Sequence, residues 1–186
     1  PADESRRSFV RQLALGATAL GTLPLAACGG SDSEPDVKFL HGVASGDPLS
    51  DRIILWTRIT PPAGHTADIP VQWEVATDAA FGTIVAKGQA NATAAKDFTV
   101  KVDATGLQPA TGYHYRFSAY AARSASARTR TLPTGSVAQV KLAVFSCANY
   151  PAGYFNVYAH AAKRGDLDAV VFLGDYIYEY PNAQGA

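Results

Sequence analysis

The sequence is poor in cysteine, has no excess of either charge and contains no glycine-rich nucleotide-binding loop. Two cysteines in 186 residues cannot form the disulfide framework of a small secreted scaffold. The 16 basic side chains are matched by 16 acidic ones and are scattered along the chain, so no strong field attracts a phosphate polymer. We therefore expect no nucleic-acid binding. A composition of 47% apolar and 17% charged residues indicates a globular protein.

The N-terminal segment lacks an apolar run long enough to span a bilayer. Its uncharged stretch, Leu13–Ala27, is 15 residues long and rich in Ala and Gly, whereas a spanning helix needs about 20 residues. The paired arginines Arg6 and Arg7 precede this stretch, which is typical of a twin-arginine leader. We expect residues 1–27 to be a signal peptide that the twin-arginine translocase recognises.

The leader ends in Leu-Ala-Ala-Cys, which resembles the lipobox of bacterial lipoproteins. Lipidation of Cys28 would anchor the mature protein to a membrane, whereas ordinary cleavage near Ala27 would leave this thiol unmodified. Residues 28–37 are rich in Gly and Ser and indicate a flexible linker. We therefore expect an exported protein, periplasmic or at the cell surface, with a lipid anchor through Cys28 as one alternative.

Residues 38–134 show a period of two that Gly, Pro, Asn and Asp interrupt at short intervals. About six or seven short strands in this pattern predict an all-β sandwich. The segment Leu107–Tyr115 resembles the fibronectin type III pattern Leu-x-Pro-x-Thr-x-Tyr-x-Tyr. In that pattern Tyr113 is the corner tyrosine, whose hydroxyl is bonded to upstream backbone, and we interpret Trp56 as the core tryptophan. The predicted fold of this part is a fibronectin type III or immunoglobulin-like sandwich.

After the sandwich the pattern changes to strand, helix, strand. Apolar strands are expected at Val140–Phe145 and Asp168–Leu173. Between them Tyr154–Arg164 has helical spacing, and Gly165 marks its end. The residues expected on the packing face of this helix are Phe155, Tyr158, Ala159 and Ala162. Residues 139–186 therefore predict the start of a parallel α/β sheet that is truncated within this chain, which makes the protein multidomain.

Two polar segments follow the predicted strands directly. Cys147 lies just after the first strand and Asp175 just after the second, and the carboxyl ends of parallel strands share one edge of a sheet. Tyr178, three residues after Asp175, can reach the same point. Thiolate, carboxylate and phenolate suit a trivalent or borderline metal better than magnesium. Taken singly, a cysteine at this place is more often a small buried hydrophobic residue than a ligand, and Gly-Asp after a strand is often only a turn.

The Gly-Asp-x-x-Tyr segment resembles the iron-binding segment of purple acid phosphatases, where the Asp bridges two metals and the Tyr binds ferric iron. A closer resemblance, to the alkaline phosphatase D (PhoD-like) family, covers nearly all of the expected mature chain. The segments that carry it are Gly42–Pro48, Ile54–Arg58, Phe145–Cys147, Gly153–Asn156 and Phe172–Tyr180. This resemblance implies export by the twin-arginine route and a sandwich followed by a metallophosphoesterase domain.

The resemblance also implies cofactors and an activity. Residues matching Cys147, Asp175 and Tyr178 would hold Fe³⁺, and Asp175, the expected catalytic residue, would also face Ca²⁺. The implied reaction is hydrolysis of phosphate mono- or diesters by a metal-activated water. The family's later Asp, Asn and His ligands have no counterpart before residue 186, so we expect this chain to be an N-terminal part that is inactive alone.

Two alternatives remain open at this point. A purple acid phosphatase relative would also begin with a sandwich, but that family has a carboxylate where this chain has Cys147. A lipid-anchored envelope binding module without catalysis would explain the leader and the sandwich, whereas the Gly-Asp-x-x-Tyr segment argues against it.

Overall fold

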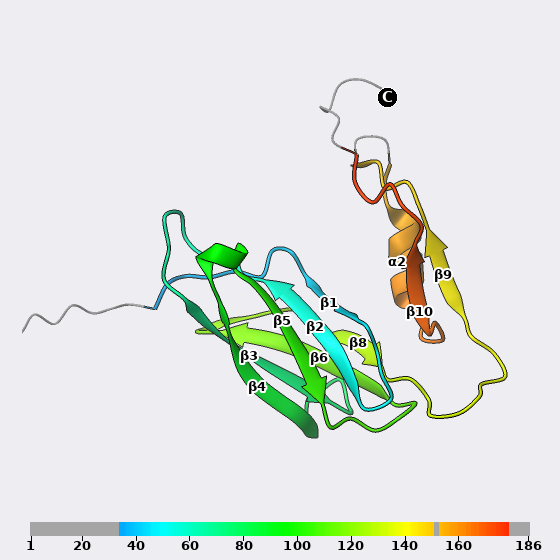
Figure 1. Cartoon of the computed structure of the whole chain (residues 1–186). Coiled ribbons are helices and arrows are strands. Elements are labelled where there is room, and N and C mark those ends of the chain that lie inside the picture. The colour runs from blue at the N-terminus through cyan, green and yellow to red at the C-terminus, as the bar shows by residue number, and fades with distance from the viewer. Residues whose placement is uncertain (1–33, 151–152, 179–186) are drawn as a thin grey trace, which may run out of the picture. The chain divides into compact units, whose positions relative to one another are not determined.

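The computed structural model describes residues 34–150 and 153–178 (Figure 1). The expected signal peptide, with Arg6 and Arg7, and the expected lipidation residue Cys28 lie outside the described residues. Over the part of the chain that is described, no helix has both the length and the apolar character needed to cross a membrane.

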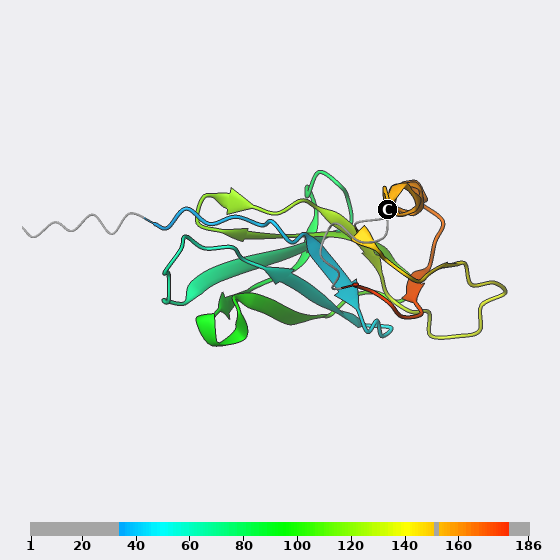
Figure 2. The same cartoon turned by 90° about the horizontal axis from the view of Figure 1, so that it is seen from above.

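Residues from Val43 to Arg130 form two antiparallel sheets. Their strands are β1 (Val43–Gly46), β2 (Arg52–Arg58), β3 (Ile69–Ala76), β4 (Ile84–Ala92), β5 (Thr99–Thr105), β6 (Gly112–Ala119), β7 (Ala122–Arg123) and β8 (Ala127–Arg130), with a short 3-10 helix, η1 (Ala94–Lys96), before β5. One sheet has the order β1-β2-β5 and the other β4-β3-β6-β7, with β8 also paired to β6. The two sheets lie one over the other (Figures 1 and 2), which confirms the predicted sandwich.

The core lies between the sheets and follows the period of two. In β2 the side chains of Ile53 and Leu55 are buried, and the alternate residues are half-buried on the opposite face. The largest fully buried aromatic side chains come from β6, where Tyr115 and Phe117 meet edge to face at 6.4 Å between ring centroids. Burial of this continuous apolar layer is the main stabilising contribution to the sandwich.

Tyr113 is the corner tyrosine, as predicted. Its side chain is 3% exposed, and its hydroxyl accepts a hydrogen bond from the Gln108 N–H at 2.8 Å. The buried hydroxyl of Thr131 closes the same corner, because it accepts from the Thr111 N–H at 3.1 Å and donates to the Gln108 carbonyl at 2.6 Å. The turn before β6 is therefore fixed to the residue that follows β8.

The prediction that Trp56 is the core tryptophan is wrong. Its neighbours Leu55 and Thr57 are both fully buried, so Trp56 lies on the other face of β2 and is only half-buried. Trp73 in β3 packs against the core instead. The physical reason is that Ile53, Ile54, Leu55 and Trp56 form an unbroken apolar run, in which alternation cannot show the buried face.

The chain enters the sandwich through residues at the end of the expected linker. Val37 is 3% exposed and belongs to the core. Lys38 forms an isolated antiparallel bridge with Thr60, with N–H to carbonyl distances of 3.0 and 2.8 Å. Residues 37 and 38 therefore contribute to the sandwich ahead of β1.

The strand–helix–strand segment comprises β9 (Leu142–Phe145), α2 (Asn156–Lys163) and β10 (Ala169–Phe172). The two strands are parallel and in register from Leu142 opposite Ala169 to Phe145 opposite Phe172. The expected parallel pair is confirmed, with each element shorter than the sequence pattern indicated.

The expected packing face of the helix is only partly right. Tyr158 is half-buried, with its ring 5.0 Å from that of Phe145, but Ala159 and Ala162 are exposed and Ala161 is half-buried in their place. Phe155 precedes the helix in a left-handed conformation, with φ of 52°, and therefore does not continue the helical spacing. The packing face runs through Tyr158 and Ala161 because these two residues lie three positions apart.

Gly88 provides a test of the packing of the second sheet. It lies opposite Trp73 in the β3–β4 ladder, and a Cβ atom there would lie 2.7 Å from the indole ring. We expect Gly88→Ala to displace the indole and to lower the free energy of unfolding by about 1–3 kcal/mol. Gly46→Ala in β1 is the matched control, because a Cβ atom there meets nothing within 4 Å. Equal denaturation midpoints for the two variants in urea would contradict this packing.

Candidate functional site

The chain segments that follow β9 and β10 remain hydrogen-bonded to each other. The Leu173 N–H donates to the Phe145 carbonyl at 2.8 Å, which extends the ladder beyond β10. Further on, the Cys147 N–H donates to the Gly174 carbonyl at 3.2 Å and the Ala148 N–H to the Asp175 carbonyl at 2.8 Å. The backbone therefore brings Cys147 and Asp175 to one edge although 28 residues separate them.

The side chains of Cys147 and Asp175 meet at this edge. The Cys147 thiol donates a hydrogen bond to Oδ2 of Asp175 at 3.5 Å, and both residues are exposed. Both have positive φ, 60° for Cys147 and 50° for Asp175, and Gly174 between the strand and Asp175 has φ of 134°. Backbone of this kind is uncommon outside glycine and concentrates at functional sites.

Tyr178 contacts the same two residues. Hydrogen bonding to Cys147 and then to Asp175 raises the pKa of the Tyr178 phenol, and partial desolvation adds to this rise. The neutral phenol is favoured beside two groups that can be anionic, whereas a cation among the three would favour the phenolate. The three residues predicted as metal ligands thus lie together.

Aromatic side chains pack together at the ends of β9 and β10, next to Cys147 and Asp175 in the sequence. Phe145 and Phe172, the last residues of β9 and β10, both lie within 6.5 Å of the Tyr158 ring, measured between centroids. Tyr176, which follows Asp175 directly, is 75% exposed and meets Phe172 edge to face at 5.0 Å. The strand ends are therefore held by α2 from one side.

Other polar residues do not join this group. Over the described ranges 34–150 and 153–178, no group of three or more His, Cys, Asp or Glu side chains could hold a metal ion. His41 contacts Arg58, and His65 packs near Phe98. The third donor at this edge is the phenol of Tyr178, which is not one of these four residue types. Its place near Asp175 was predicted from the Gly-Asp-x-x-Tyr spacing.

Two asparagines lie between Cys147 and β10 in the sequence, at positions 149 and 156. Asn156 is exposed and begins α2. Asn149 is half-buried, and its side-chain Oδ1 is buried without a hydrogen-bond partner among the described residues. This buried oxygen could not be predicted from the sequence, because an asparagine two residues after Cys147 is equally typical of a turn.

Comparison with known proteins adds an independent line of observation. The family model "PhoD-like phosphatase, N-terminal domain" matches residues 25–133, and the model "PhoD-like phosphatase" matches residues 142–186. The first match alone spans more than half of the chain.

Individual relatives agree with the family models. Alkaline phosphatase D of Bacillus subtilis (strain 168) is 41% identical over 194 residues, which is 95% of this chain and 33% of that protein. A solved structure described as the structure of PhoD is 44% identical, with a TM-score of 0.73, and the match covers 80% of this chain and 29% of that one. This chain thus spans about a third of the length of these relatives. Two family models, the sequence identity and the shared fold together show that the chain belongs to the PhoD-like phosphatase family.

Proposed function

We propose that this chain is the N-terminal part of a metal-dependent phosphoesterase that hydrolyses phosphate mono- or diesters with a metal-activated water. Membership of the PhoD-like family supports a phosphatase-type hydrolase. The observation that carries the proposed site is the convergence of Cys147, Asp175 and Tyr178 at the carboxyl ends of two parallel strands.

The donor set fits the proposed cofactors. One sulfur donor, one carboxylate and one phenol lie within hydrogen-bonding reach of one another, which suits Fe³⁺ and disfavours magnesium. Asp175 has a second carboxylate oxygen with which it would face Ca²⁺. Such a cation pair, when bound, lowers the pKa of a water molecule and neutralises the phosphoryl oxygens of an ester.

The chain's own residues position these donors. Gly174 adopts a φ of 134°, which side chains rarely allow, and this conformation turns Asp175 back toward Cys147. The paired backbone bonds between the two segments fix the spacing of the donors before any ligand is present. Asp175, the proposed catalytic residue, and Cys147 are both exposed, so a phosphoryl group can approach them.

The strand pair is proposed as the start of an α/β metallophosphoesterase domain over residues 139–186, after the sandwich of residues 38–134. Parallel strands normally belong to larger sheets with both faces covered. Here Val144 in β9 and Val170 in β10 are 53% and 61% exposed. The relatives are about three times as long, which supports completion of the sheet and of the metal site by further chain.

Export is proposed from the leader. The paired Arg6 and Arg7 before an uncharged stretch support transport by the twin-arginine translocase to the periplasm or cell surface. Cys28, at the end of the lipobox-like segment, would add a lipid anchor to the membrane. Both features lie outside the described residues.

The iron site can be tested by its colour. If Tyr178 binds Fe³⁺ as a phenolate, charge transfer from ligand to metal gives the complete protein a broad visible absorption band. We expect Tyr178→Phe to shift or remove this band and to lower the iron content, because the ring is kept and the donor oxygen is lost. Absorption spectra and iron analysis of the purified protein measure both effects.

Two further variants define the outcome. Tyr176→Phe is the matched control, because Tyr176 is a neighbouring exposed tyrosine that packs against Phe172. Cys147→Ser shows the contribution of the thiolate to the band. If Tyr178→Phe retains both the spectrum and the iron content of the unchanged protein, Tyr178 is not a ligand.

The activity of the isolated chain provides a second test. Three donors without the remaining ligands and without walls that exclude water hold a metal weakly. We therefore expect purified residues 28–186 to hydrolyse a chromogenic phosphate ester no faster than buffer with the same metals. Metal-dependent turnover that Asp175→Asn abolishes would show that the site is complete within this chain, contrary to the proposal.

The leader is tested by export of the complete protein. Lysines keep the charge of Arg6 and Arg7 but not the paired guanidinium groups, so the double variant Arg6→Lys/Arg7→Lys should accumulate as precursor in the cytoplasm. Cell fractionation and immunoblotting measure this. Cys28→Ser is the control, since it should still be exported but no longer pellet with membranes. Normal export of the double lysine variant would exclude the twin-arginine route.

A further inference from the structure

Strand β8 presents two arginines on the outer face of its sheet. Ala127 and Thr129 are half-buried and Thr131 is buried, whereas Arg128 and Arg130 between them are exposed. Because side chains alternate along a strand, both guanidinium groups leave the sheet on the same side. Both have partners in the segment that joins α2 to β10.

Arg128 caps the C-terminal end of α2. Its Nη2 donates to the carbonyl of Ala162 at 3.1 Å and to that of Arg164 at 2.8 Å. The last carbonyls of a helix have no partner within the helix and carry its negative dipole end, so a cation there is favourable. Gly165 leaves room for this approach, because a Cβ atom at that position would lie 3.3 Å from Nη1 of Arg128.

Arg130 contacts the residue that begins the second strand. Its Nη1 lies 3.1 Å from Oδ1 of Asp168, directly before β10. The other carboxylate oxygen of Asp168 accepts the Lys141 N–H at 2.9 Å, and the Asp168 N–H donates to the Lys141 carbonyl at 2.8 Å. One carboxylate therefore joins β8 to the starts of both β9 and β10.

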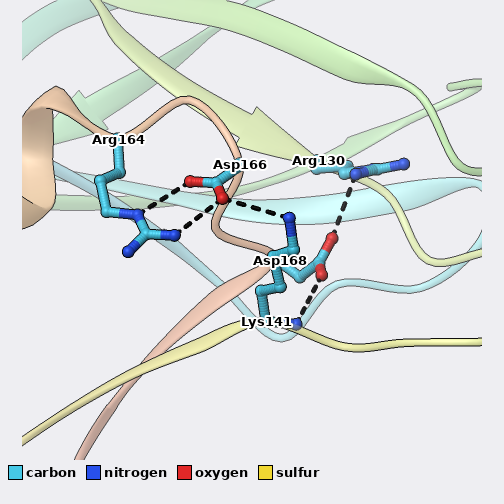
Figure 3. A network of polar contacts seen from close by, with 5 residues as sticks. All are labelled: Arg130, Lys141, Arg164, Asp166 and Asp168. Carbon is cyan, nitrogen blue, oxygen red and sulfur yellow. Dashed lines mark hydrogen bonds and ion pairs between the residues drawn. The ribbon is translucent and has the colours of Figure 1, made fainter.

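A second carboxylate organises the same turn. Asp166 accepts two hydrogen bonds from Arg164, at 2.9 and 2.7 Å, and one from the Lys141 ammonium at 3.2 Å. Arg164 first and then Lys141 hold the pKa of Asp166 well below its usual range. Figure 3 shows how Arg164, Asp166, Lys141, Asp168 and Arg130 form one connected network.

We propose that Arg128 and Arg130 form a docking surface by which the sandwich holds the turn of residues 164–168 and thereby orients the β9–β10 pair. This proposal concerns the scaffold and does not depend on the activity proposed above. Of the two contacts, that of Arg128 should dominate, because it donates two hydrogen bonds to helix carbonyls. The Arg130–Asp168 pair is 53% and 32% exposed, and ion pairs in water are weakened by solvent and salt.

Hydrogen–deuterium exchange of this chain tests the proposal. We expect Arg128→Gln to speed exchange in the last turn of α2 and in β10 by about tenfold, with the strands of the sandwich core unchanged. Arg130→Gln should give a smaller effect in β10, and high salt should reproduce part of it in the unchanged chain. Arg123→Gln is the matched control, since Arg123 is an exposed arginine of the same sheet whose side chain makes no hydrogen bond or ion pair among the described residues.

Two further measurements distinguish loss of docking from general destabilisation: the orientation of the β9–β10 pair relative to the sandwich, and the energetic coupling between Arg130 and Asp168. Residual dipolar couplings from the sandwich and from the β9–β10 pair should fit one alignment tensor in the unchanged chain and require two in Arg128→Gln/Arg130→Gln. Asp168→Asn keeps an acceptor for the Lys141 N–H and mainly removes the ion pair with Arg130. Its effect on exchange in β10 should therefore not add to that of Arg130→Gln. Two tensors in the unchanged chain, or exchange in residues 156–172 that is equal in Arg128→Gln and Arg123→Gln, would overturn the proposal.

Discussion

Parallel pairing of β9 and β10 is the constraint on which the candidate site depends. The pairing places Phe145 beside Phe172, and beyond this pair the two segments reach the candidate site over different numbers of residues. Cys147 lies two residues after its strand, whereas Asp175 lies three residues after its own. Positive φ at Gly174 and Asp175 accommodates the additional residue, and the bond from the Cys147 N–H to the Gly174 carbonyl maintains the pairing beyond it. A shift in register by one residue would separate the two donors.

Side chains alternate between the two faces of the sheet at β8, and each face makes a different set of contacts. The inward residue Thr131, directly after β8, closes the corner around Tyr113, and the outward residues Arg128 and Arg130 of β8 meet the α2–β10 turn. A shift in the register between β8 and β6 would change the inward and the outward contacts together, because each residue's face is set by its position in that ladder. The register of the sandwich sheet therefore determines that Arg128 and Arg130 face the segment between α2 and β10.

Local patterns predicted much of this structure. The corner at Tyr113 depends on residues within five positions, and the meeting of Cys147 with Asp175 follows from a general rule of parallel sheets. The face of Trp56 was misjudged, because an apolar residue stands on both faces of β2 at that point. The left-handed backbone at Cys147 and the contact of Arg128 with α2 could not be predicted, because both arise from pairing between segments that are distant in the sequence.

Charge explains why the candidate site needs such a scaffold. Cys147, Asp175 and Tyr178 can each become anionic, and hydrogen bonding to the first two already disfavours ionisation of the third. As neutral groups the thiol and the phenol hydrogen-bond within this trio, but ionisation of all three would replace these bonds with mutual repulsion. Contacts outside the trio also hold this edge, namely the ring packing of Phe145 and Phe172 against Tyr158 and the backbone bonds between the two segments. Because these contacts do not depend on the ionisation of the three groups, the scaffold can keep them together when they are anionic, and in the proposed metal site a bound cation would offset their repulsion.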